Sequence, residues 1–154
     1  MRVGLAAARA IGVAASLPVV GISTLSAFAG PYLGMPGVNG LASVIDARHD
    51  HVFMQIVGGD GRLIVTPCLI PRREAAKAMA HPDYWVTGSA ASLIDTIDHA
   101  NAPKPHIEPD RPGPEIEWVA RLGAIADPAS APPIPLYLRQ ADATPQHNGR
   151  IARL

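Results

Sequence analysis

Two histidines, His49 and His51, are the clearest candidates for metal ligands in this sequence. Alternate side chains of a β-strand point to the same face, so an H-x-H pair on a strand would direct both rings to one side. Asp46 lies nearby, but no carboxylate or third histidine stands at a spacing typical of a metal site. We therefore interpret both histidines as exposed residues at the start of a strand, and we predict no bound metal.

Three other positions could carry chemistry, and each has a simpler structural explanation. Cys68 could act as a nucleophile beside a histidine, but it lies in a run of Leu, Ile and Val, where a small buried thiol is common. Gly88 and Ser89 stand between an expected strand and an expected helix, where backbone amides can hold an anion, although a helix cap is the simpler interpretation. Asp46 and Arg48 could act as an acid or base or contact an anion, but an ion pair or turn hydrogen bond is the commoner explanation. We predict no catalytic residues and no cofactor.

Composition limits the classes of protein to which the chain can belong. Its 154 residues make one domain or two small lobes, and 48% of them are hydrophobic. Lys+Arg and Asp+Glu both number 13, so the chain lacks the basic excess of a protein that grips nucleic acid or an anionic membrane unaided. A single cysteine excludes an internal disulfide and a multi-cysteine zinc site. Arg9 and Pro18 interrupt the only apolar run that could span a bilayer.

The beginning of the chain allows two interpretations. In the first, Arg2 and Arg9 form a basic start, residues 10–22 an apolar core, and the Ala-Phe-Ala before Gly30 a cleavage site. Residues 1–29 would then be the signal peptide of an exported binding domain. In the second, residues 2–17 form an amphipathic helix that belongs to a fold.

The helical interpretation predicts two stripes of side chains. One stripe is apolar and recurs at three- and four-residue steps, as a buried face does: Val3, Ala6, Ala10, Val13 and Leu17. The other consists of small residues four apart: Gly4, Ala8 and Gly12. Each interior glycine costs about 1 kcal/mol relative to alanine, which close approach of another backbone can offset. That backbone belongs either to the protein's own sheet or to a partner helix.

The rest of the chain is predicted to alternate strands with helices. We expect strands over residues 18–22, 41–47, 51–57, 62–70 and 84–88, and helices over 25–33, 71–80, 89–100 and 113–127. The Gly/Asp-rich stretch 58–61 separates two β-rich runs, so it predicts a hairpin and not a phosphate-binding loop. This order describes an α/β domain with a mixed sheet. A hairpin followed by βα units is also how the ribonuclease H-like lobes of actin-like ATPases begin.

Several residues are expected to cap or orient these elements. Ser23 and Thr24 offer N-cap oxygens to the helix after residue 24, and Ser89 offers one to the helix after it. Pro114 falls in the first turn of the helix over 113–127. Its buried stripe is predicted from Ile116, Val119, Leu122 and Ala126. The proline-rich segment after it is predicted to lie as an extended strand against a sheet edge, through alternating Ile134, Leu136 and Leu138.

Four blocks of the sequence together resemble one protein family. They are RVGLAAARAIGVAASLPVVGISTLSAFA from Arg2, VIDARHDHVFMQ from Val44, VTGSAA from Val86 and PLYLRQADATPQ from Pro135. Their order and spacing are similar to those of the TsaB family, the non-catalytic dimerization subunit of the bacterial tRNA N6-threonylcarbamoyladenosine complex. The resemblance extends from Arg2 to about residue 146, and its first and last blocks are the most specific.

The resemblance implies a cytoplasmic scaffold and not an enzyme. Such a subunit has an actin-like fold of two lobes without a productive ATP site. It pairs with a paralogous catalytic subunit, a small ATPase joins the pair, and tRNA is reached only through the complex, with no membrane partner. The catalytic paralogue carries spaced metal-binding histidines, and His49 and His51 do not match that pattern. The implied partner interface lies on the first helix, at Gly4, Leu5, Ala8, Ile11 and Gly12.

The resemblance also implies that most of the N-terminal lobe is missing. In the family, the segment equivalent to Arg2 follows a G-P-G-S-F-T-G stretch and several strands, so we interpret the start as a truncation or a misplaced start codon. Residues 1–22 would be the remnant of that lobe, 23–139 the C-terminal ribonuclease H-like lobe, and 140–154 an extended tail. We expect an intact C-terminal lobe and an exposed first helix.

Three alternatives stay open at this point. One is an actin-like ATPase or a metallopeptidase-like enzyme, which would need a nucleotide or metal site. Another is the exported binding domain, and a third is pairing with a second copy of the same chain as a homodimer.

Overall fold

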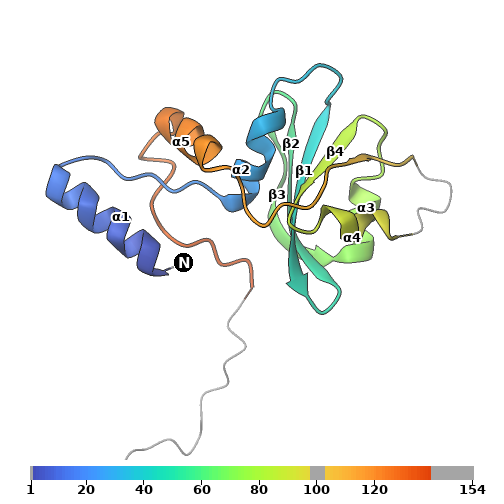
Figure 1. The fold of residues 1–154 in the computed structure, drawn as a ribbon, viewed down its shortest axis with the longest axis horizontal. Helices are drawn as coiled ribbons and strands as arrows, with labels where there is room; N and C mark the ends of the chain where they lie inside the picture. Colours follow the sequence, from blue (N-terminus) through green and yellow to red (C-terminus); the bar gives the residue numbers. More distant parts are fainter. Residues whose placement is uncertain (1, 98–102, 140–154) are drawn as a thin grey trace, which may run out of the picture.

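A five-stranded mixed sheet forms the centre of the molecule, in the order β3-β2-β1-β4-β5 (Figure 1). The computed structural model describes residues 2–97 and 103–139. β1, β2 and β3 are antiparallel neighbours, whereas β4 pairs parallel to β1 and β5 parallel to β4. The strands are β1 (Gly40–Arg48), β2 (His51–Gly58), β3 (Leu63–Pro71), β4 (Tyr84–Gly88) and β5 (His106–Ile107). The predicted α/β class and the predicted hairpin at residues 58–61 are confirmed.

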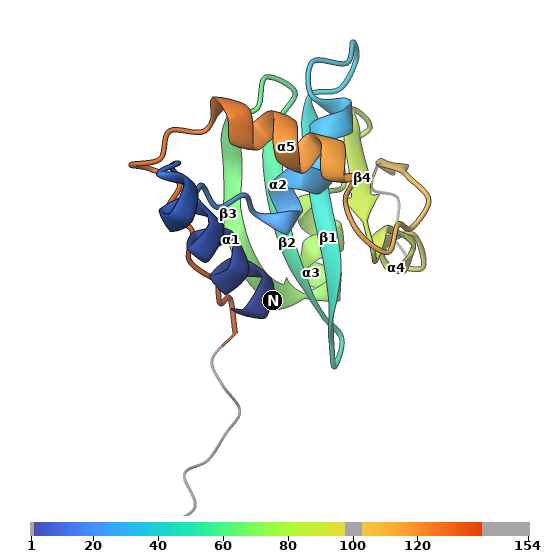
Figure 2. The ribbon, with the colours of Figure 1, turned by 60° about the vertical axis from the view of Figure 1, so that its left-hand side comes forward.

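Helices cover both faces of this sheet, and one helix lies apart from it. α2 and α5 lie over one face, and α3 and α4 over the other (Figure 2). α1 stands away from the sheet and is joined to α2 by an extended segment (Figure 1). The helices are α1 (Arg2–Ala15), α2 (Thr24–Ala29), the 3₁₀ turn η1 (Gly30–Tyr32), α3 (Arg72–Ala78), α4 (Ala91–Asp95) and α5 (Ile116–Ile125).

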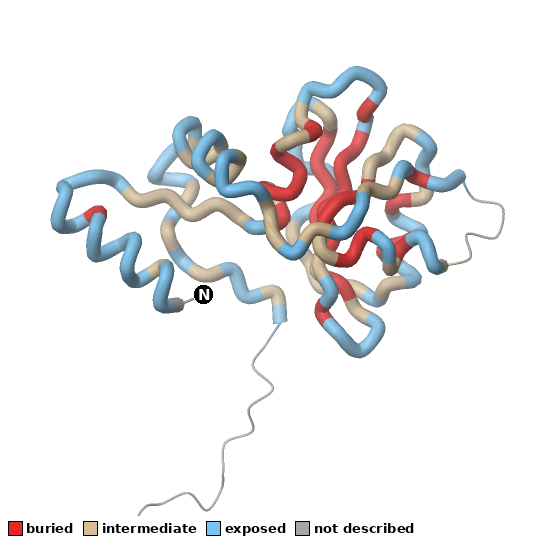
Figure 3. Tube along the Cα trace, in the orientation of Figure 1, coloured by how far each residue is buried: buried red, intermediate tan, exposed pale blue. Residues whose placement is uncertain are grey.

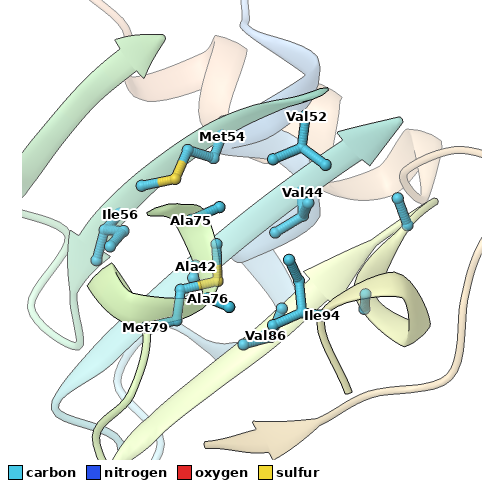
Figure 4. Close-up of a cluster of buried hydrophobic side chains, with 12 residues drawn as sticks. Ala42, Val44, Val52, Met54, Ile56, Ala75, Ala76, Met79, Val86 and Ile94 are labelled. Carbon is cyan, nitrogen blue, oxygen red and sulfur yellow. The ribbon is translucent and has the colours of Figure 1, made fainter. Parts of the chain in front are cut away.

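The main core lies between the sheet and the helices α3 and α4. Strand side chains of one face meet Met79 at the end of α3 and Ile94 in α4 (Figure 4). The strand residues on this face are Ala42, Val44, Val52, Met54, Ile56 and Val86, each at most 1% exposed. Full burial of one such aliphatic side chain stabilises the fold by roughly 1.5–3 kcal/mol. This layer is therefore the main source of stability.

The β3 edge of the sheet is irregular. The pairing of β2 with β3 shifts between Met54 and Ile56, so that Gln55 faces two residues, Thr66 and Pro67. Proline lacks an N–H and is tolerated in a sheet only at an edge or a bulge, and β3 provides both.

The predicted strand over residues 18–22 is wrong. This segment is extended, but only Gly21 forms a backbone hydrogen bond to the neighbouring segment, from its N–H to the carbonyl of Ala131 at 2.9 Å. The chain beside it continues into Pro132 and Pro133, which have no N–H to donate. A ladder therefore cannot form. The expectation that Ile134, Leu136 and Leu138 form an edge strand is wrong for the same reason, and Ile134 and Leu136 are exposed.

The helix caps follow the predictions in part. The Ser23 hydroxyl accepts a hydrogen bond from the N–H of Leu25 and caps α2, as expected. Ser89 does not cap α4, whose N-cap residue is Ala90. The carboxylate of Asp110, which follows β5, instead accepts hydrogen bonds from the N–H and the hydroxyl of Ser92 in the first turn. Asp110, which is distant in the sequence, therefore provides the hydrogen bonds at the start of α4 that were expected from Ser89.

α5 is placed differently from its prediction. It begins at Ile116, so Pro114 precedes the helix instead of occupying its first turn. Ile116 is 79% exposed, and none of the helix residues is fully buried. The inward face is rotated toward Trp118, whose ring packs on Gly30 at a distance that a side chain at residue 30 would obstruct. Val119 and Leu122 are half-buried beside it, as the predicted stripe requires.

These exposures predict a large effect for one isoleucine truncation and a small effect for another. Ile94→Ala should lower the free energy of unfolding by about 2–5 kcal/mol, because it opens a cavity in the core. Ile116→Ala should change it by less than about 0.5 kcal/mol, because that side chain is exposed. Urea titrations followed by circular dichroism measure both, and similar values for the two variants would contradict the burial described here.

Candidate functional site

α1 presents an apolar surface that its own chain leaves uncovered. Its large side chains are strongly exposed: Val3 84%, Ile11 67%, Val13 83% and, just beyond the helix, Leu17 64% (Figure 3). Arg2 and Arg9 are the only charged residues of the helix. A helix that is apolar almost all round is normally buried against other structure. The exposed first helix expected from the sequence is confirmed, and its surface is the leading candidate for a binding site.

The five predicted interface residues differ in their exposure to solvent. Gly4, Ala8 and Ile11 lie in the open, and an added side-chain carbon at Gly4 would meet nothing within 4 Å. Leu5 is half-buried. Gly12 is buried, and a side-chain carbon added there would collide with Val19. Gly4, Ala8 and Ile11 therefore form one accessible strip, whereas Gly12 packs against its own chain.

The geometry at the end of α1 explains why residue 12 must be small. Ser16 adopts a left-handed conformation with φ of 54°, and the N–H of Leu17 donates to the carbonyl of Gly12 at 2.9 Å. The N–H of Ser16 donates to the carbonyl of Val13. This pair of hydrogen bonds is a Schellman motif, which ends a helix and turns the chain sharply. The returning segment passes over Gly12, so a small residue is required there by the helix end.

A row of polar residues crosses the sheet beneath α2. Gln55 in β2, Ser43 in β1 and Thr87 in β4 are direct register partners, and all three are at most 5% exposed. The Ser26 hydroxyl in α2 and the Gln55 amide exchange hydrogen bonds at 3.2 and 3.3 Å. The Ser43 hydroxyl has no hydrogen-bond partner among the described residues. The sequence analysis missed this row, whose signal is one polar residue within each apolar strand.

A hydrogen-bonded group continues the row at the β5 edge. The Tyr32 hydroxyl donates to Glu108 at 2.9 Å, and the other carboxylate oxygen of Glu108 lies 2.9 Å from Nε2 of His106. The His106 ring stacks on Trp85 with centroids 4.1 Å apart. Burial, followed by the hydrogen bond to Glu108, raises the pKa of the Tyr32 hydroxyl. These contacts attach η1 to the strands and leave only the His106 ring facing solvent.

The other candidate chemistry does not converge. His49 lies in the turn after β1 and His51 begins β2, so the two do not share a strand face, contrary to the geometry considered for a metal pair. Burial raises the pKa of the Cys68 thiol, which disfavours the nucleophilic thiolate. Within residues 2–97 and 103–139, no three His, Cys, Asp or Glu residues are grouped as metal ligands. No helix in these ranges has the length and apolar character needed to cross a membrane.

An open cavity of about 310 Å³ lies between α2, α5 and the β2–β3 hairpin. Its polar lining side chains are Ser26 and Gln55, which are hydrogen-bonded to each other, and the rest is apolar, including Leu33, Val57 and Leu122. Its lining contains no charged group. The cavity is therefore unsuited to bind a nucleotide phosphate by charge.

Comparison with known sequences identifies relatives along nearly the whole chain. No family model matches it. Uncharacterized proteins of Mycobacterium tuberculosis and Mycobacterium bovis are 35% identical over 146 residues, which are 94% of this chain and 60% of each relative. The chain thus spans about 60% of the length of these relatives. These uncharacterized relatives assign no activity to the chain.

Comparison with solved structures shows the fold. YeaZ from Pseudomonas aeruginosa superimposes with a TM-score of 0.65 and 20% identity, over 89% of this chain and 67% of YeaZ. A second structure, described as an uncharacterized protein with similarity to the peptidase YeaZ from the same organism, gives a TM-score of 0.63 and 20% identity, over 90% and 67%. YeaZ is also named TsaB. The chain therefore has the ribonuclease H-like, actin-like fold that the sequence blocks implied.

The Tyr32 contact predicts a pH-dependent component of stability. A phenol whose pKa is raised in the folded state stabilises the fold fully below its unfolded pKa of about 10, and that contribution is lost as the pH rises through the raised value. Tyr32→Phe should remove this alkaline loss, and at pH 7 it should cost about 1–2 kcal/mol through the lost hydrogen bond. Urea titrations between pH 7 and about 11 measure both effects. Tyr137→Phe, which alters an exposed tyrosine, should retain the alkaline loss.

Proposed function

We propose that this chain is a non-catalytic scaffold that pairs with a paralogous catalytic subunit in the modification of tRNA to threonylcarbamoyladenosine. The observation that carries the proposal is α1, a helix with a continuous apolar surface that its own chain leaves exposed. The shared fold with YeaZ supports it, as do the four sequence blocks that resemble TsaB. On this proposal the chain acts in the cytoplasm, a small ATPase joins the pair, and tRNA is modified by the partner.

The accessible strip of α1 defines the side that would contact the partner. Gly4 has no side chain and Ala8 has only a methyl group, so another helix can approach the backbone of α1 closely at this strip. Ile11 lies next to Ala8 on the helix surface, because residues three apart are neighbours, and it supplies the apolar area for burial. Burial of such a side chain is worth roughly 1.5–3 kcal/mol. The strip has the features of a helix–helix contact.

Introduction of negative charge into this strip tests the proposal. Ala8→Glu combined with Ile11→Glu should weaken binding of the catalytic paralogue from the same genome by at least about 100-fold, because two carboxylates would be buried without partners. Isothermal titration calorimetry with the purified paralogue measures the affinity. The free energy of unfolding should stay within about 0.5 kcal/mol, since both residues are exposed in the free chain.

The matched control uses the opposite side of the same helix. Ala6→Glu combined with Ala10→Glu adds the same charge to the same helix, at two exposed positions away from the strip and outside the large apolar side chains. This control should pair within about threefold of the unaltered chain. If the unaltered chain does not bind the paralogue, the proposed function is wrong. If both double variants lose binding equally, the assignment of the interface to Gly4, Ala8 and Ile11 is wrong.

A further inference from the structure

We infer that the turn between β1 and β2, with the arginines around it, forms a surface that contacts the phosphate backbone of the RNA. This inference rests on the proposed function, because it names a direct contribution of this subunit to tRNA binding. The arginines of this surface, here called the turn arginines, are Arg48, Arg72, Arg73 and Arg139.

Contacts with the β1–β2 turn and with the end of β1 bring the turn arginines to one end of the sheet. Arg48 is the last residue of β1 and precedes the turn. The Arg72 guanidinium lies 2.9 Å from the Asp50 carboxylate in that turn, and the Arg72 N–H donates to the Asp50 carbonyl at 2.8 Å. Arg73 is its neighbour in α3. The Arg139 guanidinium reaches the carbonyl of Ala47, next to Arg48, at 3.5 Å. Figure 2 shows this turn projecting from the sheet at the end opposite the β2–β3 turn.

The backbone of the turn is strained. Arg48, His49 and Asp50 have φ angles of 63°, 50° and 60°, all in the left-handed region. Each such residue costs roughly 1–2 kcal/mol when it is not glycine. A two-residue hairpin turn of this type favours Asn-Gly, which would avoid much of the cost. Strain retained in a turn with charged side chains indicates that those side chains are needed there.

The electrostatics of this end also oppose stability. Arg72 and Arg73 lie in the first turn of α3, where the helix dipole disfavours positive charge. The Arg72 Nε is buried without a hydrogen-bond partner among the described residues. Two acidic residues of this region are already paired, Asp50 with Arg72 at 2.9 Å and Glu74 with Lys77 at 2.8 Å. Arg48 and Arg73 are exposed and bring two positive charges to this end of a chain whose net charge is zero.

The chemistry of these groups matches phosphodiesters. All four are arginines, whose planar guanidinium binds phosphate oxygens through two parallel hydrogen bonds. Arg48 and His49 are exposed at a protruding turn without a large apolar side chain, and Arg73 is exposed at the start of α3. The surface therefore suits a polar backbone and not a buried interface. Contacts of this kind position RNA without reading its sequence. They require only a local cluster, and the net charge of the chain does not oppose them.

The test measures RNA binding by the complete 154-residue chain. A fluorescein-labelled tRNA anticodon stem-loop is titrated at several salt concentrations from about 20 to 150 mM, and fluorescence anisotropy gives the affinity. Arg48→Gln combined with Arg73→Gln should weaken binding about tenfold at the lowest salt. The slope of log affinity against log salt should fall by about 1.5 to 2, because two phosphate contacts are lost. Arg48→Lys combined with Arg73→Lys keeps the charge and should retain most of the slope.

The control removes two positive charges elsewhere. Arg62 lies in the β2–β3 turn at the opposite end of the sheet and Arg121 in α5, and both are exposed. Arg62→Gln combined with Arg121→Gln should leave affinity and slope within about twofold and 0.5 of the unaltered chain. Equal losses in the two double variants, no salt-dependent binding by the unaltered chain, or equally tight binding of a polyglutamate peptide would each overturn the inference. Thermal melts confirm that each variant is folded.

The outcome is separable from that of the proposed function. Pairing with the catalytic paralogue should be unchanged in the Arg48→Gln and Arg73→Gln double variant, because α1 lies apart from the turn (Figure 1). If the chain fails to pair with the paralogue but binds RNA through these arginines, the scaffold proposal is wrong and the RNA surface stands.

Discussion

Burial of β1 on both faces is the constraint on which the rest of the structure depends. β1 pairs antiparallel with β2 and parallel with β4, and its residues from Gly40 to Val44 are all buried. One face of β1 packs toward α3 and α4, and the other lies beneath α2. Gly88 shows how closely the chain is fitted here, since an added side-chain carbon would lie 2.0 Å from the carbonyl oxygen of Val44. Of the two surfaces with a suggested role, the turn after β1 extends directly from this strand, whereas the strip on α1 lies apart from it, beyond α2.

The buried core and the exposed apolar helix are separate parts of the molecule. Its apolar core is concentrated between the sheet and the helices α3 and α4, whereas the apolar residues of α1 lie outside it. The polar row of Gln55, Ser43 and Thr87 marks the other face of the sheet, where packing is less complete and an open cavity remains. The apolar surface of α1 is therefore not part of the core that stabilises the fold.

Much of the fold could be predicted from the sequence, because its strands are short apolar runs with clear turn signals. The runs at residues 41–47 and 51–57 predicted the strands β1 and β2, and the Gly/Asp turn predicted the hairpin that joins β2 to β3. The failures involve partners distant in the chain. Residues 18–22 have strand composition, but a strand forms only beside a neighbour that can donate hydrogen bonds, and Pro132 and Pro133 cannot. The cap of α4 comes from Asp110, eighteen residues beyond Ser92, which no local rule could identify. The turn arginines are separated by up to 91 positions in the sequence, so only the structure places them together.

The bulge at Pro67 has a consequence for how this protein can assemble. A regular outer strand offers a row of unpaired backbone groups, to which an incoming strand from another molecule can add. Pro67 has no N–H, and the irregular pairing with β2 interrupts the regular spacing of that row. Strand addition along β3 is thereby discouraged, including the addition of one sheet to another during aggregation. At this edge, association is left to side chains, which can discriminate between partners more finely than a bare backbone can.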